Sequence, residues 1–498
     1  MRALVRSALP LAALLLLATP RPALAHLHLH HAEPAADATL TTVPHEIRLE
    51  FTERVQVAIS AIALTGPDGA SIALGPLALD PASPRTLVAP IVGTLRAGSY
   101  TVAWRAASPD GHPMRGTYAF TIAQGASGLP VTTSATAESA AVAPRGAASA
   151  AGSPAPSPAA AAARQIGGAG ALDVNSPLYA AVRWLGYAAL LAIIGAVALA
   201  LVVVPRVATR APDTDPAAER ARLAAARLGW AAAWVLLLDV VLRLVAQSYA
   251  VSGSGGAWRP AAFAALVTGT VWGWGWMLEG VAVLLALGAL GMARRHGTRG
   301  WGLATLAAAA ATFSMALSGH AVATPGHPAL LVVVDALHVT AAGGWLGTLL
   351  MIAAAGIPAA FAAPEGKRGR AVAEMVNAFS PVALACATLL ALTGLIAAWV
   401  HLGTLDALWH SDYGHVLLIK LGVIVVLAAL GAVNWRVLRP ALGDEPSAHR
   451  IRRSATAELL IGAVVLAITA VLVATPPPAE SSAAAQSAAM VEGIGPGR

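Results

Sequence analysis

Cysteine is nearly absent from this sequence, since Cys386 is the only one in 498 residues and lies within an apolar run. One cysteine excludes an internal disulfide framework and a CxxC metal site. Charged residues are scarce as well, at 11% of the chain against about 25% in soluble domains. Because 57% of the residues are hydrophobic, this deficit indicates that lipid solvates most of the chain.

Positive charge is missing where a nucleic-acid-binding protein needs it. The net charge is +7, yet residues 26–125 contain eight acidic residues against six arginines and no lysine. The basic residues lie mainly in short loops between apolar stretches, where they indicate topology rather than a polyanionic partner. No GxxxxGK(S/T) motif is present. We therefore expect neither nucleic acid nor a nucleotide as a partner.

The N-terminus has the parts of a secretory signal peptide, which we predict over residues 1–25. A basic start is followed by an apolar stretch and by Ala23-Leu24-Ala25, a small-x-small cleavage site. Cleavage there exports the following segment and leaves His26 with a free α-amine next to its imidazole. One residue then offers two nitrogen ligands.

Residues 26–125 contain short apolar stretches broken by Gly, Pro and Asp. Apolar residues alternate in residues 47–51 and 100–104, as a half-buried strand requires. About seven strands in a hundred residues predict an all-β Greek-key sandwich or small barrel. Residues 126–172 are rich in Ala, Ser, Pro and Gly and are predicted to be a linker, because such a segment buries too little surface to fold.

Residues 173–475 are predicted to form an all-α bundle of eight transmembrane helices, followed by a disordered tail over residues 476–498. Apolar sequence around the third span continues back to Ala261, which leaves the start of that span open. With the N-terminal domain outside, sixteen Arg and Lys residues lie on the inner side and four on the outer side, as the positive-inside rule requires. The spans are about 178–204, 227–250, 268–291, 301–319, 329–352, 379–400, 416–437 and 455–475.

Eleven of the fourteen histidines lie on the predicted outer side of the membrane, whereas only His296 and His449 lie on the inner side. His26 and His28 begin a histidine-rich run that, taken alone, is typical of a flexible metal-scavenging tract. Asp110 and His112 lie in a turn between two strong strands, where a carboxylate and an imidazole can face one point. Together with the amine and ring of His26, they would complete a square N3O set, which suits copper(II) better than zinc.

Several short stretches in each part of the chain form recognisable motifs. In the exported part they are His26, residues 46–51, 100–105, 108–113 and 116–120; in the membrane part they are residues 318–320, 335–338, 344–347, 413–415 and Lys420. The first set resembles the periplasmic copper-binding family CopC, and the second resembles its partner family CopD. The chain therefore looks like a CopC–CopD fusion. The resemblance implies a copper(II) site formed by His26, Asp110 and His112, to which His28 is an additional candidate ligand.

Ionisable residues inside a membrane are costly and are candidates for function. Asp335 and His338 are three residues apart and share a helix face below His320 and His327. These four residues form a candidate copper path; the alternative is that His338 simply bonds a neighbouring helix.

Three further ionisable residues lie in the second and third spans. Asp239 and Arg243 are four residues apart and are expected to pair with each other. Glu279 has no local partner in the sequence and is a candidate for a metal or proton step.

The leading interpretation is copper homeostasis: copper(II) capture outside the bacterial inner membrane, followed by transfer to the bundle for transport, with import favoured. The lipid bilayer, copper ions and periplasmic copper donors are the expected partners, and the tail is expected in the periplasm. Sequestration without transport is one alternative. A copper-dependent oxidative enzyme is another, disfavoured because Asp110 would fill an equatorial position, and a bis-histidine haem carrier is disfavoured because only His338 lies deep in a span.

Overall fold

The structure, a computed structural model, describes residues 27, 29–107, 113–128, 176–253, 258–296, 298–317, 328–475 and 478. The predicted signal peptide lies outside these residues, as do nearly all of the predicted linker and tail. The chain divides into two compact units, one containing the strands and the other the long helices. Each unit is described by itself.

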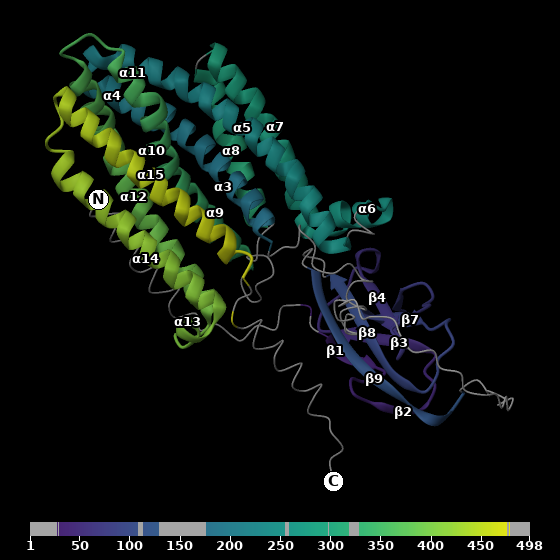
Figure 1. Ribbon diagram of the computed structural model, residues 1–498. Coiled ribbons are helices and arrows are strands. Elements are labelled where there is room, and N and C mark those ends of the chain that lie inside the picture. Colours follow the sequence, from purple (N-terminus) through teal and green to yellow (C-terminus); the bar gives the residue numbers. More distant parts are fainter. Residues whose placement is uncertain are drawn as a thin grey trace, which may run out of the picture. The chain divides into compact units, whose positions relative to one another are not determined.

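Strands between residues 29 and 127 form two sheets, which confirms the predicted β-sandwich (Figure 1). One sheet has the order β1-β3-β7-β6 and the other β2-β9-β8-β4-β5. Only β2 and β9 pair in parallel among the described strands. The strands are β1 (Leu29–Glu33), β2 (Thr39–Thr42), β3 (Glu46–Phe51), β4 (Ala61–Thr65), β5 (Ser71–Ile72), β6 (Ala78–Asp80), β7 (Ser83–Pro90), β8 (Gly98–Ala107) and β9 (Pro113–Ser127).

The core of the sandwich forms where alternating side chains of both sheets meet. Ile47, Leu49 and Phe51 of β3 are buried while their neighbours are half-buried, as the alternation in the sequence predicts. Phe51 meets Trp104 of β8 edge to face, with ring centroids 5.3 Å apart. This pair joins the two sheets at the end where β3 and β8 terminate.

Trp104 lies over the backbone of β9 because Gly116, its partner across the strand pair, has no side chain. A Cβ at Gly116 would stand 2.5 Å from Trp104 Cζ2. The indole is 6% exposed and occupies that space in the core. Glycine in a strand interior otherwise weakens the strand, so its presence marks this close approach.

The helical unit has eight helices long and apolar enough to cross a membrane within the described residues, in agreement with the predicted number. Figure 1 shows them, coloured teal to yellow, running side by side. The uncertain start of the third span is explained by a short separate helix, α6, which ends before α7 begins. The elements are α3 (Pro177–Ala198), η2 (Leu199–Val203), α4 (Val204–Arg210), α5 (Asp215–Ser252), α6 (Pro260–Gly269), α7 (Val271–His296), α8 (Thr298–Leu317), α9 (Pro328–Ala342), η4 (Gly343–Gly347), α10 (Thr348–Met351), η5 (Ile352–Gly356), α11 (Ile357–Phe361), α12 (Arg368–Leu402), α13 (Ala407–His410), α14 (Asp412–Val433), η6 (Asn434–Leu438) and α15 (Glu445–Leu472).

Glycines allow α3 and the π-helical segment η4 to approach closely. The backbone of Gly347 lies against Gly195 and against the Leu191 carbonyl, so no Cβ fits at either glycine. Small residues of this kind are how membrane helices bring their backbones together. The contact fixes the fifth span, which contains α9 and η4, against the first.

We predict that Gly116→Ala lowers the free energy of unfolding of the sandwich by about 1–3 kcal/mol, because the new methyl group must displace the Trp104 indole. Proteolysis of the purified chain in increasing urea measures the change. Thr117→Ala, at the adjacent exposed position of β9, is the matched control and should have the smaller effect. Equal losses in the two variants would contradict the packing argument.

Candidate functional site

Six of the predicted site residues lie outside the described residues: His26, His28, Asp110, His112, His320 and His327. The structure therefore leaves the predicted copper ligands of the exported domain as predictions. It does describe Glu279 on α7 and both Asp335 and His338 on α9. It also describes residues that lie close in the chain to the predicted copper ligands of the β-sandwich.

Leu27, which directly follows His26, is anchored in the core of the sandwich. Its side chain is 2% exposed and belongs to the same cluster as Phe51, Trp104 and Ala106. Two residues later, Leu29 begins β1 opposite Phe51 of β3. The chain next to His26 is thus held by hydrophobic burial at the end of the sandwich where β3 and β8 terminate.

The strands that flank residues 108–112 are paired up to their last described residues. Ala107 of β8 is opposite Pro113 of β9, and the Gln56 amide donates a hydrogen bond of 2.9 Å to the Ala107 carbonyl. Arg105 is opposite Arg115 in the same ladder. Burial, and secondarily the charge of Arg115, lowers the pKa of Arg105 to about 10. Leu27 and the strand residues on either side of residues 108–112 therefore lie at one end of the sandwich.

His338 forms a hydrogen bond to a neighbouring helix, with Nδ1 2.8 Å from Oγ1 of Thr393 on α12. The Thr393 hydroxyl donates to the Leu389 carbonyl at 2.7 Å. Because that bond uses the hydroxyl proton, we assign the Nδ1–H tautomer, in which Thr393 accepts from His338 and the lone pair of the neutral ring is on Nε2. The sequence reasoning missed Thr393, although a hydroxyl on an apolar helix was a signal for such a bond.

Asp335 and His338 lie near a positive charge, since Lys420 of α14 interacts electrostatically with both of them. Gly394 of α12 lies against the imidazole, and a Cβ there would be 3.5 Å from His338 Cε1. Asp335 and His338 on α9 and Lys420 on α14 are thus electrostatically coupled, without an ion pair within 4 Å among the described residues. Lys420 belongs to one of the motifs noted in the sequence.

The predicted pairing of Asp239 with Arg243 is wrong. Arg243 Nη1 instead lies 2.6 Å from Glu279 Oε2, which joins α5 to α7. Both side chains are buried, and Glu279 is fully so. A spacing of four residues brings Asp239 and Arg243 to one helix face, but the long Arg243 side chain reaches the facing helix.

Asp239 is fully buried, and neither of its carboxylate oxygens has a hydrogen-bond partner among the described residues. Its carboxylate lies against Gly186 of α3, in space that a Cβ would occupy. Asp239 and Arg243 of α5 and Glu279 of α7 therefore form a polar cluster on two helices, against Gly186 of α3.

Other histidines of the helical unit gather around α13. His415 Nε2 donates to the Trp409 carbonyl at 2.8 Å, and the His401 ring stacks on Tyr413 with centroids 6.1 Å apart. In the part of the chain that the structure describes, no three His, Cys, Asp or Glu residues are grouped so as to hold a metal ion.

We predict that Glu279→Gln destabilises the protein by about 3–5 kcal/mol, because it removes the carboxylate that is hydrogen-bonded to the buried Arg243 and leaves only the Asp239 charge, which is not bonded to it. Thermal unfolding of the detergent-purified chain measures the loss. Asp239→Asn is the matched control on the facing helix and should cause a much smaller change, since neither Asp239 oxygen accepts a hydrogen bond from a described residue. A larger effect from Asp239→Asn would show that Asp239 is the main partner of Arg243.

Several proteins are similar to this chain in part or over most of its length. Protein YobA of Escherichia coli strain K12 is 38% identical over 98 residues, which are 20% of this chain and 79% of YobA. Copper transport protein CutJ of Bacillus subtilis strain 168 is 25% identical over 468 residues, which are 93% of this chain and 76% of CutJ. The crystal structure of CopC from Methylosinus trichosporium OB3b is 32% identical, covers 20% of this chain and 94% of that chain, and has a TM-score of 0.19.

Three family models match consecutive parts of the chain. The CopC domain matches residues 29–123, the Copper resistance protein D-like N-terminal domain matches residues 172–330, and Copper resistance protein D matches residues 373–472. With the β-sandwich and the eight apolar helices, they indicate a multi-pass membrane protein of copper homeostasis. The chain belongs to the copper resistance and transport proteins, as a fusion of a CopC domain with a CopD membrane domain.

Proposed function

We propose that this protein imports copper: the exported sandwich captures copper(II) and passes it to the helical unit, which carries it across the membrane. The observation that carries the proposal is the similarity to Copper transport protein CutJ over 93% of the chain, which includes both units. A capture domain tethered to a membrane domain raises the local concentration of cargo at the entrance.

For capture we propose four ligands: the amine and ring of His26, Asp110 and His112. His28 is an additional candidate ligand. The position of Leu27 in the core, at the sandwich end where β8 and β9 pair at Ala107 and Pro113, supports this set. The set requires cleavage after Ala25, because only then is the His26 amine free. Nitrogen and oxygen ligands of this kind suit copper(II).

For the membrane step we propose a path from His320 and His327 to Asp335 and His338. His338 supports this role because its Nδ1–H is held by Thr393, which leaves Nε2 to bind the cargo. Lys420 balances the Asp335 charge while no cargo is bound. Glu279 stays in its ion pair with Arg243 and positions α5 against α7 along this path.

For orientation we propose that both the sandwich and the C-terminal tail face the periplasm, with the helical unit in the bacterial inner membrane. The excess of Arg and Lys in the loops on the opposite side supports this orientation. The chain has no P-loop motif, so we propose movement down a gradient or by a carrier mechanism. Copper is then the cargo of a transporter rather than the cofactor of an enzyme.

We predict that His112→Ala and His338→Ala each lower cytoplasmic copper in cells at limiting external copper, by about tenfold or more, because each removes a ligand from the proposed route. Uptake is measured by elemental analysis of washed cells that carry the full chain. His449→Ala, whose ring stacks on Phe361 at the opposite end of the bundle from α13, is the control and should leave uptake unchanged.

If neither His112→Ala nor His338→Ala changes cytoplasmic copper, transport is wrong and sequestration outside the membrane is the better account. The processed N-terminus is verified by mass spectrometry in the same cells, because a retained residue before His26 removes the amine ligand.

We also predict that Thr393→Val lowers uptake by about tenfold while the protein still folds, since valine keeps the volume but releases His338 Nδ1. The matched control is Thr388→Val on the same helix, where the hydroxyl only bonds the Leu384 carbonyl. Equal uptake in the two variants would show that the orientation of His338 has no part in transport.

A further inference from the structure

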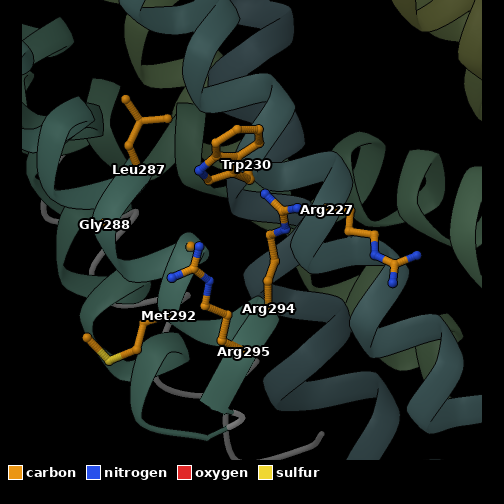
Figure 2. A pocket seen from close by; sticks show the side chains of 8 residues that line it. Arg227, Trp230, Leu287, Gly288, Met292, Arg294 and Arg295 are labelled. Carbon is orange, nitrogen blue, oxygen red and sulfur yellow. The ribbon is translucent and has the colours of Figure 1, made fainter.

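A basic pocket of about 500 Å³ lies between α5 and α7, away from the polar clusters described above. Figure 2 shows the Arg294 guanidinium beside the Trp230 indole, with Arg295 on the same helix. The volume is within the range of small-molecule sites. Its lining consists of Arg227, Trp230, Leu287, Gly288, Gly291, Met292, Arg294 and Arg295.

The pocket has three positive charges and no carboxylate in its lining. Arg227, Arg294 and Arg295 are exposed, and none of them forms an ion pair with a described residue. The Arg294 guanidinium lies over Trp230, 4.5 Å from the ring centroid. This stacking holds Arg294 in place. Because no carboxylate in the lining neutralises the three arginines, they can interact with a bound anion.

The lining changes from charged to apolar along α7. Arg294 and Arg295 are the last residues of a candidate membrane span, Val271–Arg295. Leu287 is seven or eight residues earlier in the chain, which places it about 10 Å deeper along the helix axis. Nothing lies within 4 Å of a Cβ placed at Gly288, so the pocket is open there.

We propose that this pocket binds an anionic phospholipid, with the phosphate at Arg227, Arg294 and Arg295 and the start of an acyl chain along Leu287 and Gly288. Planar guanidinium groups suit phosphate oxygens, and basic pockets between membrane helices bind lipid headgroups. The apolar half distinguishes a lipid from free phosphate, which needs only the charged half. In the orientation proposed above, the lipid comes from the cytoplasmic leaflet.

The test uses the full chain purified in detergent and measures its thermal stability against added phosphatidylglycerol, phosphatidylcholine or inorganic phosphate. Phosphatidylglycerol alone should stabilise the wild-type protein. Arg227→Gln/Arg294→Gln should weaken the apparent affinity for phosphatidylglycerol by about tenfold or more, because two charges near the headgroup are lost. Arg227→Lys/Arg294→Lys should lose less affinity than the glutamine variant, since the charges remain although the planar guanidinium groups and the stacking on Trp230 are lost.

Arg452→Gln/Arg453→Gln is the matched control, because it removes two neighbouring exposed charges on α15 outside the pocket. This control should respond to phosphatidylglycerol as the wild type does. The proposal is overturned if the pocket variant keeps the wild-type response, if the control loses as much, or if phosphate alone gives the same stabilisation. Copper uptake takes no part in the measurement, so a failure of the transport proposal leaves the outcome unaffected.

Discussion

A polar side chain on a lipid-solvated helix must find its partner inside the protein, because no water is available in the bilayer core. This constraint explains several polar contacts between helices of the helical unit. The ion pair of Arg243 with Glu279 joins α5 to α7, and the bond of His338 to Thr393 joins α9 to α12. Trp184 Nε1 donates to the Ala463 carbonyl and so joins α3 to α15. Each polar group that would be unfavourable if unpaired in the bilayer thereby also specifies which helices are neighbours.

The same constraint separates the polar groups that act structurally from those on the proposed copper path. Arg243 and Glu279 satisfy each other, so moving cargo through them would break a buried pair. Among the described residues His338 is bonded at one nitrogen, and Lys420 of α14 acts electrostatically on both His338 and Asp335. A ring whose orientation is set by one bond and whose second nitrogen has a lone pair is the usual arrangement of a metal-ligating histidine.

The sandwich obeys a different rule, since apolar side chains packed between its two sheets hold it together. Buried apolar side chains hold its ends, and Leu27 is the one closest to the predicted cleavage site after Ala25. An N-terminal residue is normally poorly ordered unless the chain beside it is tied down. Burial of Leu27 would supply that restraint for the copper ligand proposed at His26.

The sequence by itself determined the two-part fold, the eight spans and the family. Alternation in residues 47–51 and the lengths of the apolar runs are local patterns, and local patterns follow directly from the periods of strands and helices. The tertiary structure decided which polar groups meet. Spacing suggested Asp239 as the partner of Arg243, whereas packing of α5 on α7 brought Glu279 to 2.6 Å. Thr393 is 55 residues from His338, and only helix packing joins them, because contacts between helices depend on distances that no local pattern in the sequence encodes.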